Sequence, residues 1–285
     1  MVGSTRDVRA SPRGWSPQWH RGNVCCGHFF VGCGAPEPLT LNNIRAASLS
    51  VNGGTVAIAP SGTDAGTSIM GSLSIAGDAI PTAKLDLADN AAIINYTGAS
   101  PVATVRQQIL AGRCGADLGA TWNGQGITSS AAAAAEPESR SIGYAENAAL
   151  PLGPYTNFRG QPVDETSLLL AYTRTGDANL DGIVNDDDVT IVSAAYAPGI
   201  SQPPCALGDF DYNGFVDDDD VTLLGVFYDP SAEALITPAP GSASAVAAVP
   251  EPGTLLLAGF ALAALASGWA LRSNRLNSRL RPVGP

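Results

Sequence analysis

One pattern of twelve residues occurs twice in the chain, as Asp177-Ala-Asn-Leu-Asp-Gly-Ile-Val-Asn-Asp-Asp-Asp188 and as Asp209-Phe-Asp-Tyr-Asn-Gly-Phe-Val-Asp-Asp-Asp-Asp220. Both copies carry side-chain oxygens at positions one, three, five, nine and twelve, and glycine at position six. This is the spacing with which an EF-hand-type loop surrounds a hard cation with oxygen ligands. The pattern therefore predicts two cation-binding loops.

The expected ligands follow from the position within each loop. In the first loop they are Asp177, Asn179, Asp181, the backbone carbonyl of Ile183, Asn185 and Asp188. In the second loop they are Asp209, Asp211, Asn213, the carbonyl of Phe215, Asp217 and Asp220. We expect one Ca²⁺ in each loop rather than Mg²⁺, because every ligand is oxygen and the loop has room for ~6–8 of them. Gly182 and Gly214 allow the sharp turn that each loop requires.

Each loop runs into an expected helix, and the two helices match position for position. Their shared apolar residues are Val189, Val192 and Tyr196 in the first, and Val221, Leu224 and Tyr228 in the second. We expect these faces to bury against each other, and Val184 to pair with Val216 as a short ladder between the loops. Because crowded carboxylates repel one another, folding of the loops should be coupled to cation binding.

The acidity of the chain is confined to this segment. The net charge is −11, and residues 176–220 hold eleven Asp and no Lys, Arg or Glu. The other acidic and basic residues cancel. A local acidic site favours a cation as partner and excludes nucleic acid, whose phosphates it would repel.

Residues 39–173 read as a β-rich repeat region. Three phrases place two aliphatic residues on one strand face before a turn: Leu49-Ser-Val-Asn-Gly-Gly54, Leu73-Ser-Ile-Ala-Gly-Asp78 and Leu85-Asp-Leu-Ala-Asp-Asn90. The recurrence predicts either the stacked rungs of a β-solenoid or a sandwich of short strands. The fold class is thus mostly β, followed by the small α-helical loop pair of residues 174–229.

Three further stretches of the region have local signals. Ser100-Pro101 with Gly112 predicts one amphipathic helix with a serine cap and a glycine stop. Residues 113–163 read as loop-rich, and Ser167–Thr173 reads as a strand that leads into the first acidic loop.

The C-terminal tail has three parts in order. Residues 230–248 form an Ala-, Pro- and Ser-rich linker. Pro250, Glu251 and Pro252 then precede an apolar run over 254–271 without a charge, and an arginine cluster follows. A run of this length is near the lower limit for spanning a bilayer, so we expect a transmembrane helix with its basic end in the cytoplasm.

Two resemblances follow from these motifs. The loop pair resembles the type I dockerin module, although positions ten and eleven, usually small hydroxyl residues, are Asp here. The Pro-Glu-Pro, apolar run and arginine cluster of residues 249–285 resemble a PEP-CTERM sorting signal, which is cleaved near Pro250–Pro252 by an exosortase. Residues 45–230 as a whole are similar to planctomycete-type surface proteins that join autotransporter-associated β-repeats to a dockerin-like tail.

The resemblances imply a non-catalytic, exported protein of the cell envelope or cell surface, with an exosortase-type enzyme as partner. The alternative is an assembly subunit for polysaccharide degradation, which binds a cohesin-like protein or a surface polysaccharide. A glycoside hydrolase would need two carboxylates across a groove, and the acids of residues 39–97 are Asp64, Asp78, Asp86 and Asp89. We expect no enzyme, since two of these four fall in predicted turns.

Residues 1–38 read as an irregular leader without a recognisable export signal. Arginines on the cytoplasmic side would place the rest of the chain outside, which requires export. We therefore expect the true start to lie upstream, or the chain to be the end of a longer protein.

Overall fold

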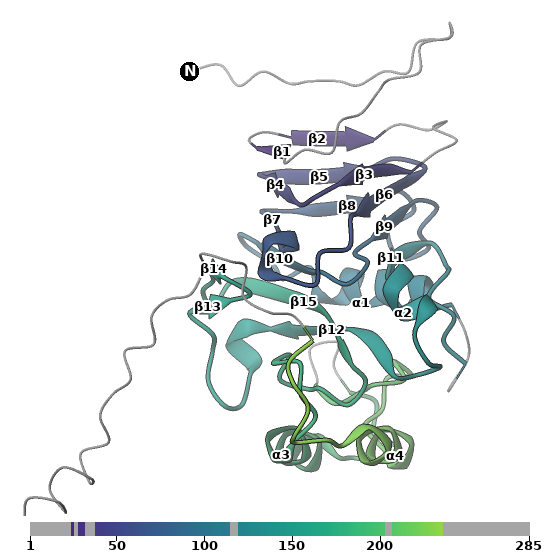
Figure 1. Ribbon diagram of the computed structural model, residues 1–285, viewed down its shortest axis with the longest axis vertical. Helices are drawn as coiled ribbons and strands as arrows, with labels where there is room; N and C mark the ends of the chain where they lie inside the picture. Colours follow the sequence, from purple (N-terminus) through teal and green to yellow (C-terminus); the bar gives the residue numbers. More distant parts are fainter. Residues whose placement is uncertain (1–23, 26–27, 32–37, 115–118, 203–206, 236–285) are drawn as a thin grey trace, which may run out of the picture. The chain divides into compact units, whose positions relative to one another are not determined.

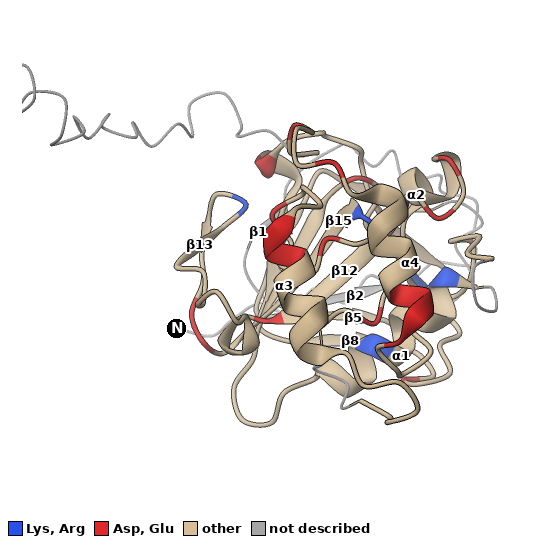
Figure 2. Ribbon diagram, turned by 90° about the horizontal axis from the view of Figure 1, so that it is seen from below, with Lys and Arg blue, Asp and Glu red and all other residues tan. Residues whose placement is uncertain are grey.

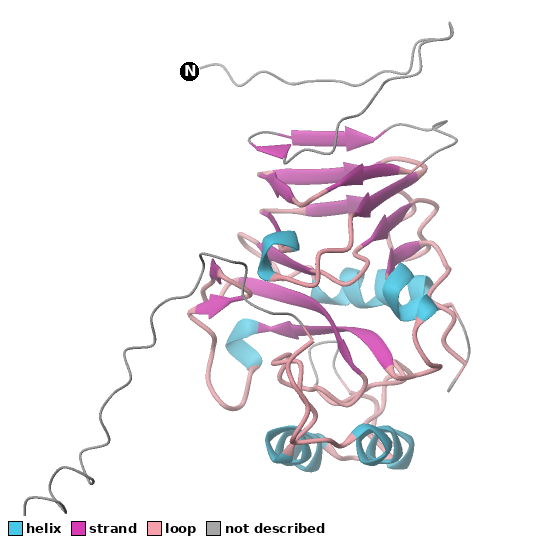
Figure 3. Ribbon diagram, in the orientation of Figure 1, coloured by secondary structure: helices cyan, strands magenta, loops and turns pink. Residues whose placement is uncertain are grey.

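The structure is a computed structural model that describes residues 24–25, 28–31, 38–114, 119–202 and 207–235. Its strands are β1 (Val24–Cys25), β2 (His28–Val31), β3 (Leu39–Leu41), β4 (Ile44–Ala46), β5 (Ser48–Val51), β6 (Thr55–Ile58), β7 (Ser68–Met70), β8 (Leu73–Ile75), β9 (Lys84–Asp86), β10 (Ala91–Asn95), β11 (Gly126–Thr128), β12 (Arg140–Glu146), β13 (Asn157–Phe158), β14 (Gln161–Pro162) and β15 (Ser167–Arg174). The helices are α1 (Val102–Arg113), α2 (Ser130–Ala134), α3 (Asp186–Ala195) and α4 (Asp218–Phe227), with short 3₁₀ turns at Asp64–Gly66 and Asn147–Ala149. The β-rich prediction is confirmed (Figure 3).

Successive turns of the chain supply one strand to each of three sheets. The first sheet contains β1, β4, β7 and β10 in parallel, the second β2, β5 and β8, and the third β3, β6, β9 and β11. In the fourth turn, α1 takes the place in sequence between β10 and β11 that a strand holds in the earlier turns. Figure 1 shows the turns stacked on one another. Of the two predicted β architectures, parallel stacking matches the rungs of a solenoid.

Two of the three recurring phrases lie directly on each other. Leu49 pairs with Leu73 and Val51 with Ile75 across β5 and β8. The third phrase does not join them, because Leu85 lies in β9 and pairs with Val56 of the third sheet. Its likeness to the other two reflects the same need, a buried aliphatic on a short strand, on a different side of the stack.

The helix predicted after Ser100 is present, but its glycine has another role. The Oγ of Ser100 accepts a hydrogen bond from the backbone N–H of Val102 at 3.1 Å, but the helix begins at Val102 and Pro101 holds the N-cap position without a side-chain capping bond, so the predicted serine cap is wrong by one residue. Gly112, however, lies inside α1, and a Cβ there would come within 1.8 Å of the carbonyl oxygen of Ile127. The glycine allows α1 to approach β11, and the helix ends at Arg113, followed by Cys114 as C-cap with φ of 44°.

The parallel stack ends in an antiparallel pair. β15 pairs antiparallel with β10 on one side and with β12 on the other, which makes β12 the edge of the first sheet. Leu168 and Leu170 of β15 face one hydrophobic core, while Leu169 and Ala171 face a second core on the opposite side. β15 is therefore buried on both faces, and the edge strand β12 separates the two cores next to the acidic loops.

Two sequence interpretations need correction. The loop-rich stretch 113–163 contains β12, one of the longest strands, which Gly143 and the polar residues at its ends conceal. The leader of residues 1–38, expected to be irregular, contributes β1 and β2, which extend two of the parallel sheets. In both cases pairing with a neighbouring strand outweighs a weak local signal.

The predictions for the C-terminal tail mostly concern residues that the structure does not describe. Residues 254–271, expected to span a membrane, lie outside the described residues, as does most of the linker 230–248. Within the described residues no helix has the length and hydropathy needed to cross a bilayer.

Gly112→Ala should destabilise the protein, because the new methyl group meets backbone rather than a side chain that can move. We expect the free energy of unfolding to fall by about 1–3 kcal/mol or more, as for other overpacked cores. Gly225→Ala in α4 is the matched control, since nothing lies within 4 Å of its Cβ. It should leave stability unchanged or raise it by up to about 1 kcal/mol. Denaturant unfolding of both variants checks this; equal stabilities would contradict the close approach.

Candidate metal centre

The two acidic loops adopt the same backbone path. The glycines at position six, Gly182 and Gly214, have φ of 92° and 95°, which an L side chain rarely adopts. Position four is left-handed as well, with φ of 67° at Leu180 and 64° at Tyr212. The sharp turn predicted from the glycines is therefore present in both loops.

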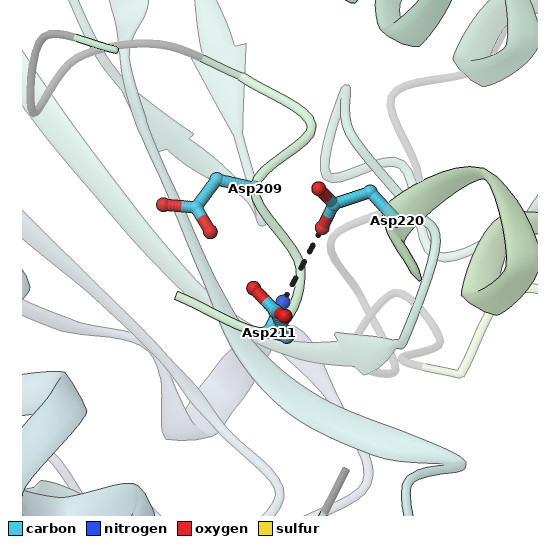
Figure 4. A group of neighbouring side chains, drawn as sticks. All are labelled: Asp209, Asp211 and Asp220. Atoms are coloured by element: carbon cyan, nitrogen blue, oxygen red, sulfur yellow. Dashed lines mark hydrogen bonds between the residues drawn. The ribbon is translucent and has the colours of Figure 1, made fainter. Parts of the chain in front are cut away.

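Three carboxylates of the second loop converge. Asp209, Asp211 and Asp220 are buried, and one oxygen from each lies within 4.8 Å of the others. They come from positions one, three and twelve, so the loop has folded its end back onto its start. Figure 4 shows the three carboxylates around a common space. Oxygen-only ligands in this arrangement suit a hard cation.

The first loop has an equivalent set of hydrogen bonds. Oδ2 of Asp177 accepts from the N–H of Gly182 at 2.8 Å, and Oδ2 of Asp209 accepts from Gly214 at 3.1 Å. At position twelve, Oδ1 of Asp188 accepts from Ala178 at 2.7 Å. Its counterpart Asp220 accepts from Phe210 at 2.6 Å. In the first loop position three is Asn179, so its buried set is Asp177, Asn179 and Asp188.

Positions five and nine have further roles. Asp181 and Asn213 at position five lie nearer the surface, and their Oδ1 atoms accept from the N–H of Ile183 at 2.8 Å and of Phe215 at 2.7 Å. Asn185 and Asp217 at position nine cap α3 and α4. Each takes part in a capping box with the position-twelve aspartate. The structure thus brings every predicted side chain into two compact loops and gives position nine a helix-capping role.

A cation fits this donor set. Oδ1 of Asp209 is a buried oxygen that lacks a hydrogen-bond partner among the described residues. Burial, with nearby carboxylates adding to it, raises the pKa of Asp177 and Asp220 to about 7, and that of Asp188 and Asp211 to about 6. Such carboxylates need a proton or a cation near neutral pH. The residues named above would hold the ion through their oxygens.

The two repeats exchange contacts across the pair. The N–H of Asp229, beyond α4, donates to the carbonyl of Val184 in the first loop at 3.0 Å. The N–H of Ala197, beyond α3, donates to the carbonyl of Val216 in the second loop at 3.0 Å. The predicted ladder between Val184 and Val216 is therefore wrong: both side chains are buried together, but each backbone pairs with the segment after the other helix.

The tyrosines that follow the two helices also form reciprocal hydrogen bonds between the repeats. Tyr196 donates its hydroxyl to Oδ1 of Asp218 at 2.6 Å, and Tyr228 donates to Asp186 at the same distance. Asp186 and Asp218 stand at position ten of their loops. Figure 2 shows the acidic ends of α3 and α4 at opposite ends of the pair, which permits this reciprocal contact.

The helix faces differ in part from the prediction. Val192 and Leu224 are buried between the repeats, as expected. Val189 and Val221 are 38% and 44% exposed instead. Ile191 and Leu223, two residues further along each helix, are buried in their place. Ile191 packs with β-region residues of the second core, so α3 contacts the β-region as well as α4.

The loops sit on both faces of the edge strand β12. Leu180 joins the core on one side, where a Cβ at Gly143 would come within 2.5 Å of its Cδ2. Tyr212 joins the opposite core, donates its hydroxyl to the carbonyl of Ile142 at 2.7 Å and stacks on Tyr144. The position-four side chains thus clamp β12 between the loops, and the described loop pair and β-region lie in one compact unit.

Residues outside the motif also contact the loops, among them Arg159, Arg106 and Thr173. Arg159 donates to the carbonyl of Leu180 at 3.2 Å, and Arg106 of α1 donates to the carbonyl of Tyr212 at 2.7 Å. Arg106 also forms an ion pair with Asp209 at 2.7 Å. The hydroxyl of Thr173 donates to Oδ2 of Asp177. Sequence spacing does not reveal these contacts, because they join segments up to 106 residues apart.

A pocket of about 340 Å³ lies beside the first loop. Its lining includes Asn179, Asp181 and Asp187 on one side, and Leu152 and Tyr155 on the other. This pocket gives solvent access to positions three and five of that loop.

Two of the four carboxylates considered for glycoside hydrolysis accept hydrogen bonds from backbone N–H groups. Asp89 accepts hydrogen bonds from the N–H groups of Ser61 and Gly62 at 2.8 and 3.0 Å. Asp86 accepts from Ala88 and Ser130 at 2.8 and 2.9 Å. The sorting residues Pro250, Glu251 and Pro252 lie outside the described residues.

Without divalent cations the protein should lose stability as the pH rises from about 4 to about 7. The folded state keeps protons on Asp177 and Asp220 over this range, while the unfolded chain, with ordinary aspartate pKa values, releases them. Urea unfolding in a chelator at several pH values checks this. The double variant Asp177→Asn, Asp220→Asn should show a flatter profile; an equally steep one would contradict the assignment.

Comparison with known proteins identifies the C-terminal tail. The family model described as the PEP-CTERM protein-sorting motif matches residues 248–275. Neither the curated proteins nor the solved structures gave a match to the chain. The chain therefore carries a PEP-CTERM sorting motif, which marks an exported, envelope-associated protein that an exosortase processes.

Proposed function

We propose that this exported protein is a non-catalytic calcium-binding component of the cell surface, in which two EF-hand-like loops cap a β-stack. One observation carries the proposal: buried carboxylates from positions one, three and twelve converge in the second loop, and one buried Asp209 oxygen has no hydrogen-bond partner among the described residues. The parallel set of hydrogen bonds in the first loop supports a second site.

Calcium is favoured over smaller or softer ions. The candidate ligands are carboxylate, amide and backbone oxygens, without a histidine or cysteine in either loop. Zinc and copper sites typically include nitrogen or sulfur ligands, and Mg²⁺ is usually bound by few protein groups and several waters.

The cap role follows from where the loops attach. Leu180 and Tyr212 enter the two cores beside β12, so loss of loop structure would also remove core side chains from the β-region. A cation that neutralises the carboxylates would then stabilise the whole unit. Asp186 and Asp218 are engaged by tyrosines of the opposite repeat, which supports an internal role for position ten rather than contact with a cohesin-like partner.

Calcium titration of the full chain, with binding recorded by calorimetry, tests the proposal. We expect two binding events and a rise in melting temperature with Ca²⁺ concentration. Asp188→Asn and Asp220→Asn should each remove one event, because each replaces the buried carboxylate at position twelve with a neutral amide.

The matched controls are Asp187→Asn and Asp219→Asn. These residues precede the position-twelve aspartates and are exposed. Both events should persist in the control variants. Absence of calcium binding in the native chain, or equal losses in controls and position-twelve variants, would refute the calcium assignment.

The sorting motif supports a separate test. Expressed with an exosortase, the native chain should shorten near Pro250–Pro252, as intact-mass measurement would record. Glu251→Ala should block this shortening, whereas Glu233→Ala, upstream of the matched residues 248–275, should not. Equal processing of both variants would show that Glu251 is not part of the recognised signal.

A further inference from the structure

Among the described residues, a candidate ligand carboxylate forms an ion pair in the second loop and none does so in the first. Arg106, in α1 of the β-region, places its Nη2 at 2.7 Å from Oδ2 of Asp209 and at 2.7 Å from the carbonyl oxygen of Tyr212. Both side chains of the ion pair are largely buried, with 11% and 4% of their surfaces exposed. One guanidinium thus contacts a candidate ligand and the residue that anchors the loop to β12.

The equivalent places in the first loop receive different partners. The β-region supplies the neutral hydroxyl of Thr173 to Asp177, where it supplies Arg106 to Asp209. Arg159 donates to the carbonyl of Leu180, as Arg106 does to Tyr212. Arg174 donates its hydrogen bond to the carbonyl of Gly182, and its charge acts on Asp177 without a direct ion pair.

The two loops differ in the number of candidate ligand carboxylates. Among the side chains at positions one, three, five, nine and twelve, the first loop has three carboxylates, Asp177, Asp181 and Asp188. The second has four, Asp209, Asp211, Asp217 and Asp220. The positive charge of Arg106 lies beside the loop with the additional carboxylate, and the guanidinium of Arg113 also favours the charged form of Asp211 in that loop.

We propose that Arg106 is a built-in counter-ion of the second loop, which keeps that loop seated on β12 without a bound cation and weakens cation binding there. The part of this inference that concerns cation binding rests on the proposed function. A fixed positive charge beside Asp209 repels an incoming cation, while it offsets the cost of burying that carboxylate when no cation is present. Oδ1 of Asp209 remains available as a ligand, since Arg106 and Gly214 both contact Oδ2.

This counter-ion role predicts effects of opposite sign from one substitution. Arg106→Met keeps much of the apolar length of the side chain but removes its charge. In a chelator the variant should unfold at lower temperature than the native chain, because Asp209 loses its partner. In an Asp188→Asn background, which isolates the second site, the same substitution should tighten Ca²⁺ binding on the order of tenfold. A purely structural role for Arg106 would lower both stability and affinity.

The control is Arg159→Met, which removes the contact to the Leu180 carbonyl but no hydrogen bond to a candidate ligand carboxylate. It should lower stability without tightening either site. Unchanged or weaker second-site binding in Arg106→Met would overturn the proposal. If that variant is unfolded in a chelator, refolding on addition of CaCl₂ supports the proposal, and failure to refold overturns it.

A double-mutant cycle tests the counter-ion without calcium. Adding Asp209→Asn to Arg106→Met should restore part of the lost stability in a chelator, because no uncompensated buried charge remains. Additive losses would overturn the ion-pair role. If the native chain binds no Ca²⁺, the proposed function fails, and this cycle alone decides whether Arg106 is the counter-ion of Asp209.

Discussion

The free edge of β12 is the constraint on which the arrangement depends. An edge strand offers unpaired backbone groups and, in this sheet, lies between two hydrophobic cores. The acidic loops resolve both problems together, since Leu180 and Tyr212 fill the cores on either face and the tyrosine hydroxyl bonds to a β12 carbonyl. The loop pair is thereby part of the β-unit, although its sequence pattern resembles that of a separate module.

The loops themselves could be predicted because their chemistry is local. Gly182 and Gly214 mark positions with positive φ, and the alternation of oxygen-bearing residues fixes which side chains turn inward. The aliphatic phrases at Leu49 and Leu73 likewise revealed two strands that stack in register. In each case the signal and the single loop or strand that it specifies lie within a dozen residues.

The attachment of the loops could not be predicted, because it joins segments far apart in sequence. Leu180 and Tyr212 look like ordinary loop residues until β12 is seen beside them, and β12 was hidden by Gly143. Arg106 looks like a solvated residue of an amphipathic helix. Similarly, the reciprocal bonds of Tyr196 and Tyr228 follow from the antiparallel placement of two helices, which the matched spacing alone does not specify.

The contact between Asp229 and Val184 has a mechanical consequence. The chain continues from α4 toward the sorting motif at residues 248–275. Tension applied through that end of the chain reaches the Asp229–Val184 hydrogen bond and α4 before it reaches any strand of the stack. A cation in the proposed sites would therefore stand where load enters the folded unit, between the sorting motif and the strands of the stack.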